Sequence, residues 1–172
     1  ERETEKYIFS DCAINIDPDA QTLAEIAYQS YLTAKMIGLD PKVAMLSFST
    51  KGSAKGPMID KVIQATKIVH ETHPEVKIDG ELQFDAAFVA NVAAKKAPNS
   101  EVAGKANVFV FPELQSGNIG YKIAQRLGNF TAVGPVLQGL AAPINDLSRG
   151  CSANDVYLAG ILTAVQAIEA KK

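Results

Sequence analysis

Residues Lys42–Glu71 read KVAMLSFSTKGSAKGPMIDKVIQATKIVHE and combine three kinds of local pattern. Lys42–Phe48 is short and almost continuously apolar, which is typical of a strand buried on both faces. Ser49–Gly56 is polar and contains glycines, as loops do. Pro57–Glu71 has the period of an amphipathic helix, whose apolar face comprises Ile59, Val62, Ile63, Thr66 and Val69. A buried strand that leads through a polar loop into a helix predicts one unit of an α/β fold.

The same alternation of short apolar and longer Ala-rich segments continues on both sides of this stretch. Further strands are predicted at Tyr7–Cys12, Val76–Leu82, Ala106–Phe111, Thr131–Leu137 and Ala142–Leu147. A helix is predicted to begin at Asp17 as N-cap, with Pro18 at its first position, and to close at Gly38. Other helices are predicted at Ala86–Lys96, Gly117–Leu127 and Ser152–Ala170, the last followed by the favourable charges of Lys171 and Lys172. We therefore predict an α/β fold with a parallel-dominated sheet and helices on both faces.

Composition and charge narrow the functional classes. The 172 residues are 47% hydrophobic and carry a formal net charge of -2, so no basic field for nucleic acid is expected. No apolar run approaches the roughly 20 residues of a membrane-spanning helix, and the charged start at Glu1–Lys6 lacks the apolar part of a signal peptide. Cys12 and Cys151 are interpreted as reduced thiols of a cytoplasmic protein, although the sequence leaves a disulfide open. His70 and His73 end a predicted helix without further ligands nearby, so no metal site is expected.

The Ser49–Gly56 loop is the first candidate site. Ligands of open parallel sheets bind beyond the carboxyl ends of the strands, where this loop is predicted to lie. Hydroxyl groups, lysines and backbone N–H groups in that position suit a phosphate. The loop lacks the Gly-Lys-Ser/Thr triplet that ends a Walker A motif. A mobile polar loop without a ligand is an equally supported alternative.

The segment Pro112–Lys122 (PELQSGNIGYK) is the second candidate site, again between a strand and a helix. Its two glycines permit a close approach of the backbone. The spacing of Asn118, Tyr121 and Lys122 places their polar ends near one face of a helix's first turn. Ordinary surface residues at a helix start are the alternative, so this pattern by itself is a weak indication.

The segment Asn145–Asp155 (NDLSRGCSAND) is the third candidate site. Ser152 and Asp155 have the spacing of a capping pair, which is a purely structural interpretation. Ser148 and Arg149 directly precede a helix N-terminus, which favours an anion, and a guanidinium binds phosphate or acyl phosphate through a forked pair of hydrogen bonds. A carboxylate at Asp155 beside such an anion is costly unless it has a task such as accepting a proton.

Several of these segments resemble phosphate acetyltransferases. The matching segments are Met45–Thr50, Ile78–Ala87, Phe111–Leu114 with Ser116–Asn118, Gly134–Leu140 and Asn145–Ser152. They occur in the family's order and at its spacing, and the resemblance extends from about Tyr7 to Ala170. A resemblance of this extent is strongly specific.

The resemblance implies a particular architecture. Members of the family have two α/β domains around a cleft, and their fold is similar to isocitrate and isopropylmalate dehydrogenases. Residues 1–137 would form the second domain, and residues 138–172 would be the C-terminal segment that returns to the first domain. The N-terminal half of that first domain, with the family's upstream CoA-binding arginines, would lie outside this chain. A homodimer is also expected, since several members dimerise through the second domain.

The resemblance also implies acetyl transfer between coenzyme A and inorganic phosphate, with coenzyme A as a substrate and no cofactor. A base takes the thiol proton, the thiolate attacks the carbonyl of acetyl phosphate, and phosphate leaves. Asp155 matches the base, and Ser148 and Arg149 match the residues that hold the acyl phosphate. Further phosphate contacts are implied at Ser49, Thr50, Gly52, Ser53, Asn118, Tyr121 and Lys122. A chain without the rest of the cleft is expected to have little activity of its own.

Three alternatives remain beside this function. Phosphate butyryltransferase is the related enzyme for a longer acyl chain, and pocket volume rather than sequence distinguishes it. A similar domain of some malic enzymes binds acetyl-CoA without catalysis, but there the stretch matching Ser148–Arg149 is typically lost, and here it is intact. A nucleotide-binding module would need a Walker or Rossmann pattern, which the sequence lacks.

Overall fold

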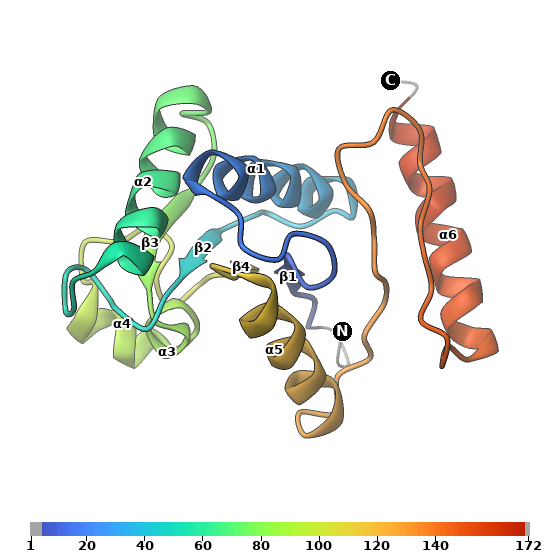
Figure 1. Cartoon of the computed structure of the whole chain (residues 1–172). Helices are drawn as coiled ribbons and strands as arrows, with labels where there is room; N and C mark the ends of the chain where they lie inside the picture. The colour runs from blue at the N-terminus through green and yellow to red at the C-terminus, as the bar shows by residue number, and fades with distance from the viewer. Residues whose placement is uncertain (1–4, 171–172) are drawn as a thin grey trace.

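The computed structural model describes residues 5–170, and a parallel four-stranded sheet forms its centre (Figure 1). The strands are β1 (Ile8–Ser10), β2 (Val43–Leu46), β3 (Ile78–Leu82) and β4 (Val108–Val110), in the spatial order β1-β4-β2-β3. Ile8 lies opposite Val108, and Val43 lies opposite both Val108 and Ile78, with every pair of strands parallel. The predicted parallel sheet is confirmed.

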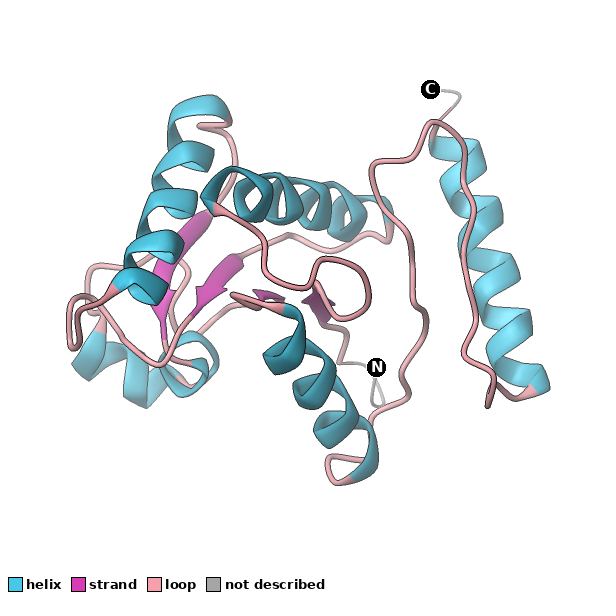
Figure 2. Cartoon of the chain, viewed as in Figure 1, coloured by secondary structure: helices cyan, strands magenta, loops and turns pink. Residues whose placement is uncertain are grey.

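Helices cover both faces of this sheet, as predicted (Figure 2). They are α1 (Ala20–Met36), α2 (Pro57–Thr72), α3 (Phe84–Phe88), α4 (Ala90–Lys96), α5 (Leu114–Arg126) and α6 (Ala153–Glu169). Because side chains alternate along a strand, Val43 and Met45 pack with α1 and α2, whereas Ala44 and Leu46 pack in a second cluster with α3 and α4. All four residues of β2 are buried, which explains its continuous apolar run.

The start of α1 differs from the prediction. The N-cap is Asp19 rather than Asp17, because the Asp19 carboxylate accepts a hydrogen bond from the backbone N–H of Thr22 at 2.7 Å. Pro18 therefore precedes the helix. The predicted end is confirmed, since Gly38 follows α1 with a φ of 81°.

Two other helices have different bounds from those predicted. The single helix expected at Ala86–Lys96 is divided into α3 and α4, because Val89 adopts an extended conformation between them. α5 begins three residues before the predicted Gly117. The Glu113 carboxylate caps it by accepting hydrogen bonds from the backbone N–H groups of Gln115 at 2.7 Å and Ser116 at 2.9 Å.

The strands predicted at Thr131–Leu137 and Ala142–Leu147 do not form. These residues lie in the extended connection from α5 to α6, which runs up beside α1 and back down along α6 (Figure 1). The segments have the local pattern of strands, but they pair with none of the described strands. Pro135 and Pro143 also remove backbone donors that a sheet ladder would use.

Residues 131–170, which we call the C-terminal arm, are held largely by side-chain amides. Asn145 Nδ2 donates to Thr163 Oγ1 at 2.8 Å and to Gln166 Oε1 at 2.6 Å, which ties the extended connection to α6. Ala159 is the buried residue of α6. None of the helices within residues 5–170, including α6, is long and apolar enough to cross a membrane. The predicted role of Lys171 and Lys172 falls outside the described residues.

Candidate functional site

The carboxyl ends of the four parallel strands lie at one edge of the sheet, and a polar segment follows each of them. The Asp11–Asn15 turn follows β1, the Ser49–Ala54 loop follows β2, Gln83 follows β3, and the start of α5 follows β4. This edge is where open parallel sheets bind ligands. Two of the three candidate sites predicted from the sequence therefore lie where expected.

The Ser49–Ala54 loop is organised around a buried carboxylate. Glu81, on β3, is only 2% exposed. Its Oε1 accepts hydrogen bonds from Ser49 Oγ at 2.9 Å and from the backbone N–H of Gly52 at 2.8 Å. Ser49 Oγ in turn accepts the backbone N–H of Ala54 at 3.0 Å. The donors expected to bind phosphate at Ser49 and Gly52 are thus already engaged within the protein.

Thr50 and Lys51 are also engaged by β3 and the residue that follows it. Thr50 Oγ1 donates to Gln83 Oε1 at 3.1 Å and accepts the backbone N–H of Gln83 at 2.9 Å. Lys51 pairs with Asp79. Ser49 and Thr50 are buried, whereas Gly52 and Ser53 form the exposed tip of the loop. Of the four predicted contacts in this loop, Ser53 is the exposed residue that carries a hydroxyl group, and this hydroxyl accepts the backbone N–H of Thr50 at 3.0 Å.

The three predicted residues of α5 come together as their spacing implied. Lys122 Nζ donates to Asn118 Oδ1 at 2.7 Å and lies 5.8 Å from the centroid of the Tyr121 ring. Asn118 Nδ2 donates to the backbone carbonyl of Cys12 at 3.1 Å, which links α5 to the turn after β1. Gly117 permits this approach, because a Cβ atom there would lie 2.2 Å from the carbonyl oxygen of Asp11.

The turn after β1 contains a carboxylate and a thiol whose pKa values shift in opposite directions. Burial acts to raise the pKa of Asp11, but hydrogen bonds from the N–H groups of Ala13, Asn15 and Ile14 together hold it below its usual range. Burial, with a contribution from the charge of Asp11, raises the pKa of the Cys12 thiol to about 12. Cys12 is therefore a neutral thiol at physiological pH and a poor nucleophile.

The third candidate site lies at the start of α6, where the capping arrangement is present. Asp155 Oδ2 accepts the backbone N–H of Ser152 at 2.7 Å and its hydroxyl at 2.9 Å, and Ser152 Oγ accepts the N–H of Asp155 at 3.3 Å. These bonds from Ser152, backbone first, lower the pKa of Asp155. Ser148 and Arg149 are exposed just before the helix, and Arg149 makes no ion pair within residues 5–170.

The structure thus divides the predicted site residues into two groups. The Ser49–Ser53 loop and the α5 residues share the carboxyl edge of the sheet, whereas Ser148, Arg149 and Asp155 belong to the C-terminal arm. No hydrogen bond or ion pair within the described part of the chain joins the two groups. The arm is instead fixed to the sheet by Gln138.

Sequence reasoning missed three polar residues that position these groups: Glu81, Gln138 and Asn145. Gln138 Nε2 donates to Ser10 Oγ at 3.2 Å and to Ser30 Oγ at 3.3 Å, and both serines are buried. All three residues lie inside segments quoted for the family resemblance. An acidic or amide side chain within an apolar segment could have indicated these positions. Such a side chain is expected to be buried, and buried polar groups need hydrogen-bond partners.

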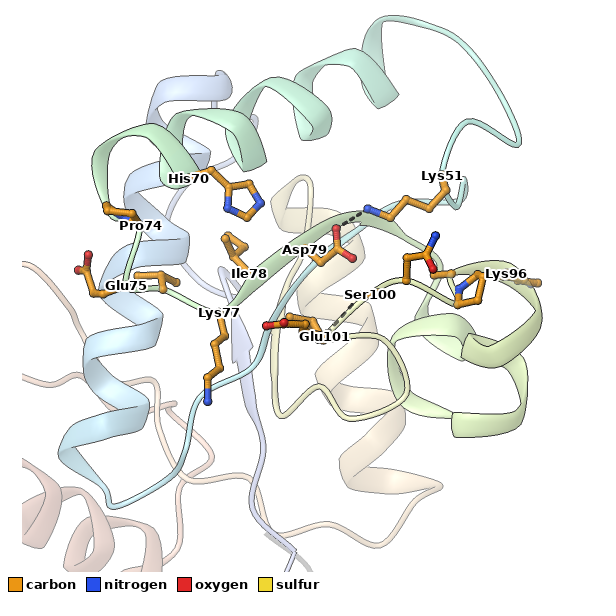
Figure 3. A pocket seen from close by; sticks show the side chains of 15 residues that line it. Lys51, His70, Pro74, Glu75, Lys77, Ile78, Asp79, Lys96, Ser100 and Glu101 are labelled. Carbon is orange, nitrogen blue, oxygen red and sulfur yellow. Dashed lines mark hydrogen bonds and ion pairs between the residues drawn. The ribbon is translucent and has the colours of Figure 1, made fainter.

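A hollow with a volume of about 590 Å³ lies beside the outer edge of β3 (Figure 3). Lys51, Lys96, Asp79 and Glu101 are among its lining residues, so charges of both signs surround it. It borders the Ser49–Ala54 loop only through Lys51. Within residues 5–170, no group of three or more His, Cys, Asp or Glu side chains is arranged to hold a metal ion.

Residues 1–164 match the family described as phosphate acetyl/butaryl transferase, which is nearly the whole chain. The chain belongs to the phosphate acetyl/butaryl transferase family. The phosphate acetyltransferase of Bacillus subtilis is 66% identical over 97% of this chain and 52% of its own length. That of Staphylococcus epidermidis is 62% identical over 96% of this chain and 52% of its own length.

Solved structures of this family share the fold. A phosphotransacetylase from Streptococcus pyogenes has a TM-score of 0.94 and 66% identity, covering 96% of this chain and 50% of that protein. A branched-chain phosphotransacylase from Enterococcus faecalis has a TM-score of 0.74 and 27% identity, covering 91% of this chain and 58% of that protein. The chain therefore spans about half the length of the family members it matches.

Proposed function

We propose that this chain forms part of a phosphate acetyltransferase, which transfers an acetyl group reversibly between coenzyme A and inorganic phosphate. The observation that carries the proposal is the 66% identity to the Bacillus subtilis phosphate acetyltransferase over 97% of the chain. The substrates are coenzyme A or acetyl-CoA, acetyl phosphate and phosphate, and no cofactor takes part. All steps are acid–base and acyl-transfer chemistry, which side chains can perform.

Ser148 and Arg149 are proposed to hold the acyl phosphate. Both are exposed directly before the N-terminus of α6, where backbone N–H groups and the helix dipole favour an anion. The Arg149 guanidinium lacks an ion-pair partner within residues 5–170, so it is free to bind a phosphate oxygen or the carbonyl oxygen on which charge develops.

Asp155 is proposed to accept the proton of the coenzyme A thiol. The thiolate then forms a bond to the acetyl carbonyl carbon, and the bond from that carbon to the phosphate oxygen breaks. In the arrangement described, Oδ2 is engaged by Ser152 while Oδ1 makes no hydrogen bond to the described residues. The Ser152 bonds lower the pKa of Asp155 and make it a weak base. A base for a thiol of pKa near 8.5 must therefore lose some of this stabilisation in the assembled site.

The exposed tip of the Ser49–Ser53 loop and the residues Asn118, Tyr121 and Lys122 are proposed as further phosphate contacts. They share one edge of the sheet and offer a hydroxyl, an amide, a phenol and an ammonium group. The connection of the arm to the sheet through Gln138 supports a site assembled from both regions.

The remaining proposals concern assembly. Residues 1–137 are proposed as the second domain of an isocitrate dehydrogenase-like protein, and residues 138–172 as the segment that returns to the first domain. A cytoplasmic homodimer is proposed as well. The support for a homodimer is an exposed apolar stripe at helical spacing, formed by Ile119 and Ile123 of α5 and by Leu127 directly after it, which is 85% exposed.

The test of the proposed function uses two proteins: this chain, and a completed protein in which it is joined to the part of the Bacillus subtilis relative that it leaves uncovered. Acetyl-CoA formation from acetyl phosphate and coenzyme A is followed by the thioester absorbance. We expect turnover by the completed protein and little by the chain alone. A completed protein that folds but forms no acetyl-CoA contradicts the proposal, and faster turnover of butyryl phosphate indicates phosphate butyryltransferase instead.

A further inference from the structure

The Ser49–Ala54 loop is held by side chains from three alternate positions at the end of one strand. Two lie on β3 and the third directly follows it. Each contacts a different part of the loop, and the pairs are Asp79 with Lys51, Glu81 with Ser49 and Gly52, and Gln83 with Thr50. The loop is therefore shaped by the strand beside it rather than by its own sequence alone.

Glu81 differs from its two neighbours because it is both charged and almost fully buried. A buried carboxylate is costly unless hydrogen bonds stabilise it. The loop supplies those bonds, from the hydroxyl of Ser49 at 2.9 Å and the backbone N–H of Gly52 at 2.8 Å. The dependence is mutual, since the donors of the loop would otherwise need another anion or water.

The backbone at the tip of the loop adopts a conformation that such hydrogen bonds stabilise. Lys51 has a φ of 50° and Gly52 a φ of 83°, so two consecutive residues are left-handed. This conformation is uncommon for a residue other than glycine. The carboxylate of Glu81 fixes the N–H of Gly52, and its backbone carbonyl accepts the N–H of Lys51 at 3.3 Å.

The effect of Glu81 extends to Ser53 at the exposed tip of the loop. Ser49 Oγ, which donates to Glu81, lies 3.2 Å from Ser53 Oγ. Ser53 Oγ accepts the backbone N–H of Thr50 at 3.0 Å. Because the single hydroxyl proton of Ser49 goes to Glu81, Ser53 Oγ donates to Ser49 Oγ, and a continuous chain of hydrogen bonds joins the buried carboxylate to Ser53 at the exposed tip.

We infer that Glu81 is a positioning residue for the phosphate side of acyl transfer. The inference rests on the proposed function and deepens it. Glu81 does not touch the phosphate itself. Its carboxylate engages Ser49 and Gly52 and so fixes the position of the loop tip, including Ser53, beside the phosphate of the substrate.

The kinetic test compares Glu81→Gln and Glu81→Ala with Glu101→Gln in the completed protein. Glu101→Gln is the matched control, because Glu101 is exposed and outside the loop. We expect Glu81→Gln to raise the KM for acetyl phosphate about tenfold, the effect of weakening one charge-assisted hydrogen bond. The KM for coenzyme A and kcat should stay within about twofold, because the acetyl-accepting side is untouched. An unchanged KM for acetyl phosphate, or a loss confined to kcat, overturns the inference.

A second measurement does not depend on turnover. Hydrogen exchange of residues 49–56 is followed in this chain with and without inorganic phosphate. We expect phosphate to slow hydrogen exchange of the loop in the wild-type chain and to have little effect in Glu81→Gln. Glu81→Gln is used here because it keeps a hydrogen-bond acceptor and the side-chain volume, so the measurement remains possible if Glu81→Ala fails to fold. Absence of protection in the wild type, or equal protection in both, overturns the inference even if acetyl-CoA is formed. Protection without any acetyl-CoA formation supports it while contradicting the proposed function.

Discussion

The sheet region, residues 8–126, and the C-terminal arm, residues 131–170, satisfy their polar groups in different ways. In the sheet region, Ser49, Thr50 and Glu81 are buried and bonded to one another or to neighbouring strands. In the arm, Ser148 and Arg149 are exposed, and α6 buries only Ala159. The groups best placed to meet a substrate therefore lie where the chain packs least, while the sheet region supplies a rigid support.

This difference predicts that substitutions in the arm mainly change the rate of the reaction, whereas substitutions of buried polar groups in the sheet region change the stability of the fold. Removing a side chain from the arm's candidate site should change rates with little effect on folding, because few contacts are lost. Removing a buried polar group from the sheet region should lower the free energy of unfolding, since an unsatisfied partner remains. The following predictions test this division between the arm and the sheet region.

The largest expected difference between the two regions is in the reactivity of their cysteine thiols, Cys12 in the sheet region and Cys151 in the arm. Cys151 is exposed, whereas Cys12 is half-buried with a pKa raised to about 12. At pH 8 the thiolate fraction of Cys12 should be on the order of a thousandfold below that of an ordinary thiol of pKa 8.5. Labelling with a chromogenic disulfide should therefore modify one thiol promptly, and Cys151→Ser should abolish that phase. Two equally fast thiols would contradict the described packing of α5 against the turn after β1.

Arg149→Ala tests whether the arm carries the chemistry. We expect turnover of the completed protein to fall roughly 100- to 1,000-fold, the usual cost of losing one preorganised donor to a developing charge. The melting temperature should be unchanged, because Arg149 is exposed. Arg149→Lys should restore only part of the rate, since an ammonium lacks the forked geometry. Wild-type turnover in Arg149→Ala would remove the arm from the proposed mechanism.

Asp155→Asn distinguishes the base from the helix cap. Asparagine can still accept the Ser152 N–H, so the start of α6 should persist and melting should be little changed. If Asp155 takes the thiol proton, as proposed, acetyl-CoA formation should fall on the order of 100-fold. Turnover close to wild type would reduce Asp155 to a structural cap and leave Ser148 and Arg149 as an anion clamp.

Asn145→Ala and Asn107→Ala compare equivalent amides in the two regions. Asn145 ties the extended connection to α6, whereas Asn107 bonds Lys42 N–H at 2.8 Å and the Asp40 carbonyl at 2.9 Å beside the sheet. Either substitution should cost about 2 kcal/mol through lost hydrogen bonds. Hydrogen exchange should show faster opening confined to α6 for Asn145→Ala, but throughout the sheet for Asn107→Ala. Global destabilisation by both would mean that the arm and the sheet unfold as one unit.

The sequence predicted the sheet region well because its signals are local. The apolar run of β2 and the period of α2 each depend on residues within a few positions of one another, and so does the capping pair at Ser152 and Asp155 in the arm. The same local reasoning failed at Thr131–Leu137. These residues have strand-like side chains, but a strand also needs a partner, and partners come from distant sequence.

The candidate site shows the same limit. The spacing of Asn118 and Lys122 predicted their contact, because both lie on one helix face. The hydrogen bond between Ser49 and Glu81 joins residues 32 positions apart, and the sequence of the Ser49–Gly56 loop does not predict it. A loop with free donors and a loop whose donors are already used have the same sequence pattern.

The bond between Gln138 and Ser10 also has a consequence for synthesis on the ribosome. β1 pairs with β4, and Ser10 then receives the amide of Gln138, 128 residues further along the chain. Close contacts between α1 and α2 involve segments that emerge soon after one another, whereas the contacts of β1 wait until β4 and Gln138 have been translated. Of the four strands of this sheet, the first to be translated is accordingly the last to have its contacts completed.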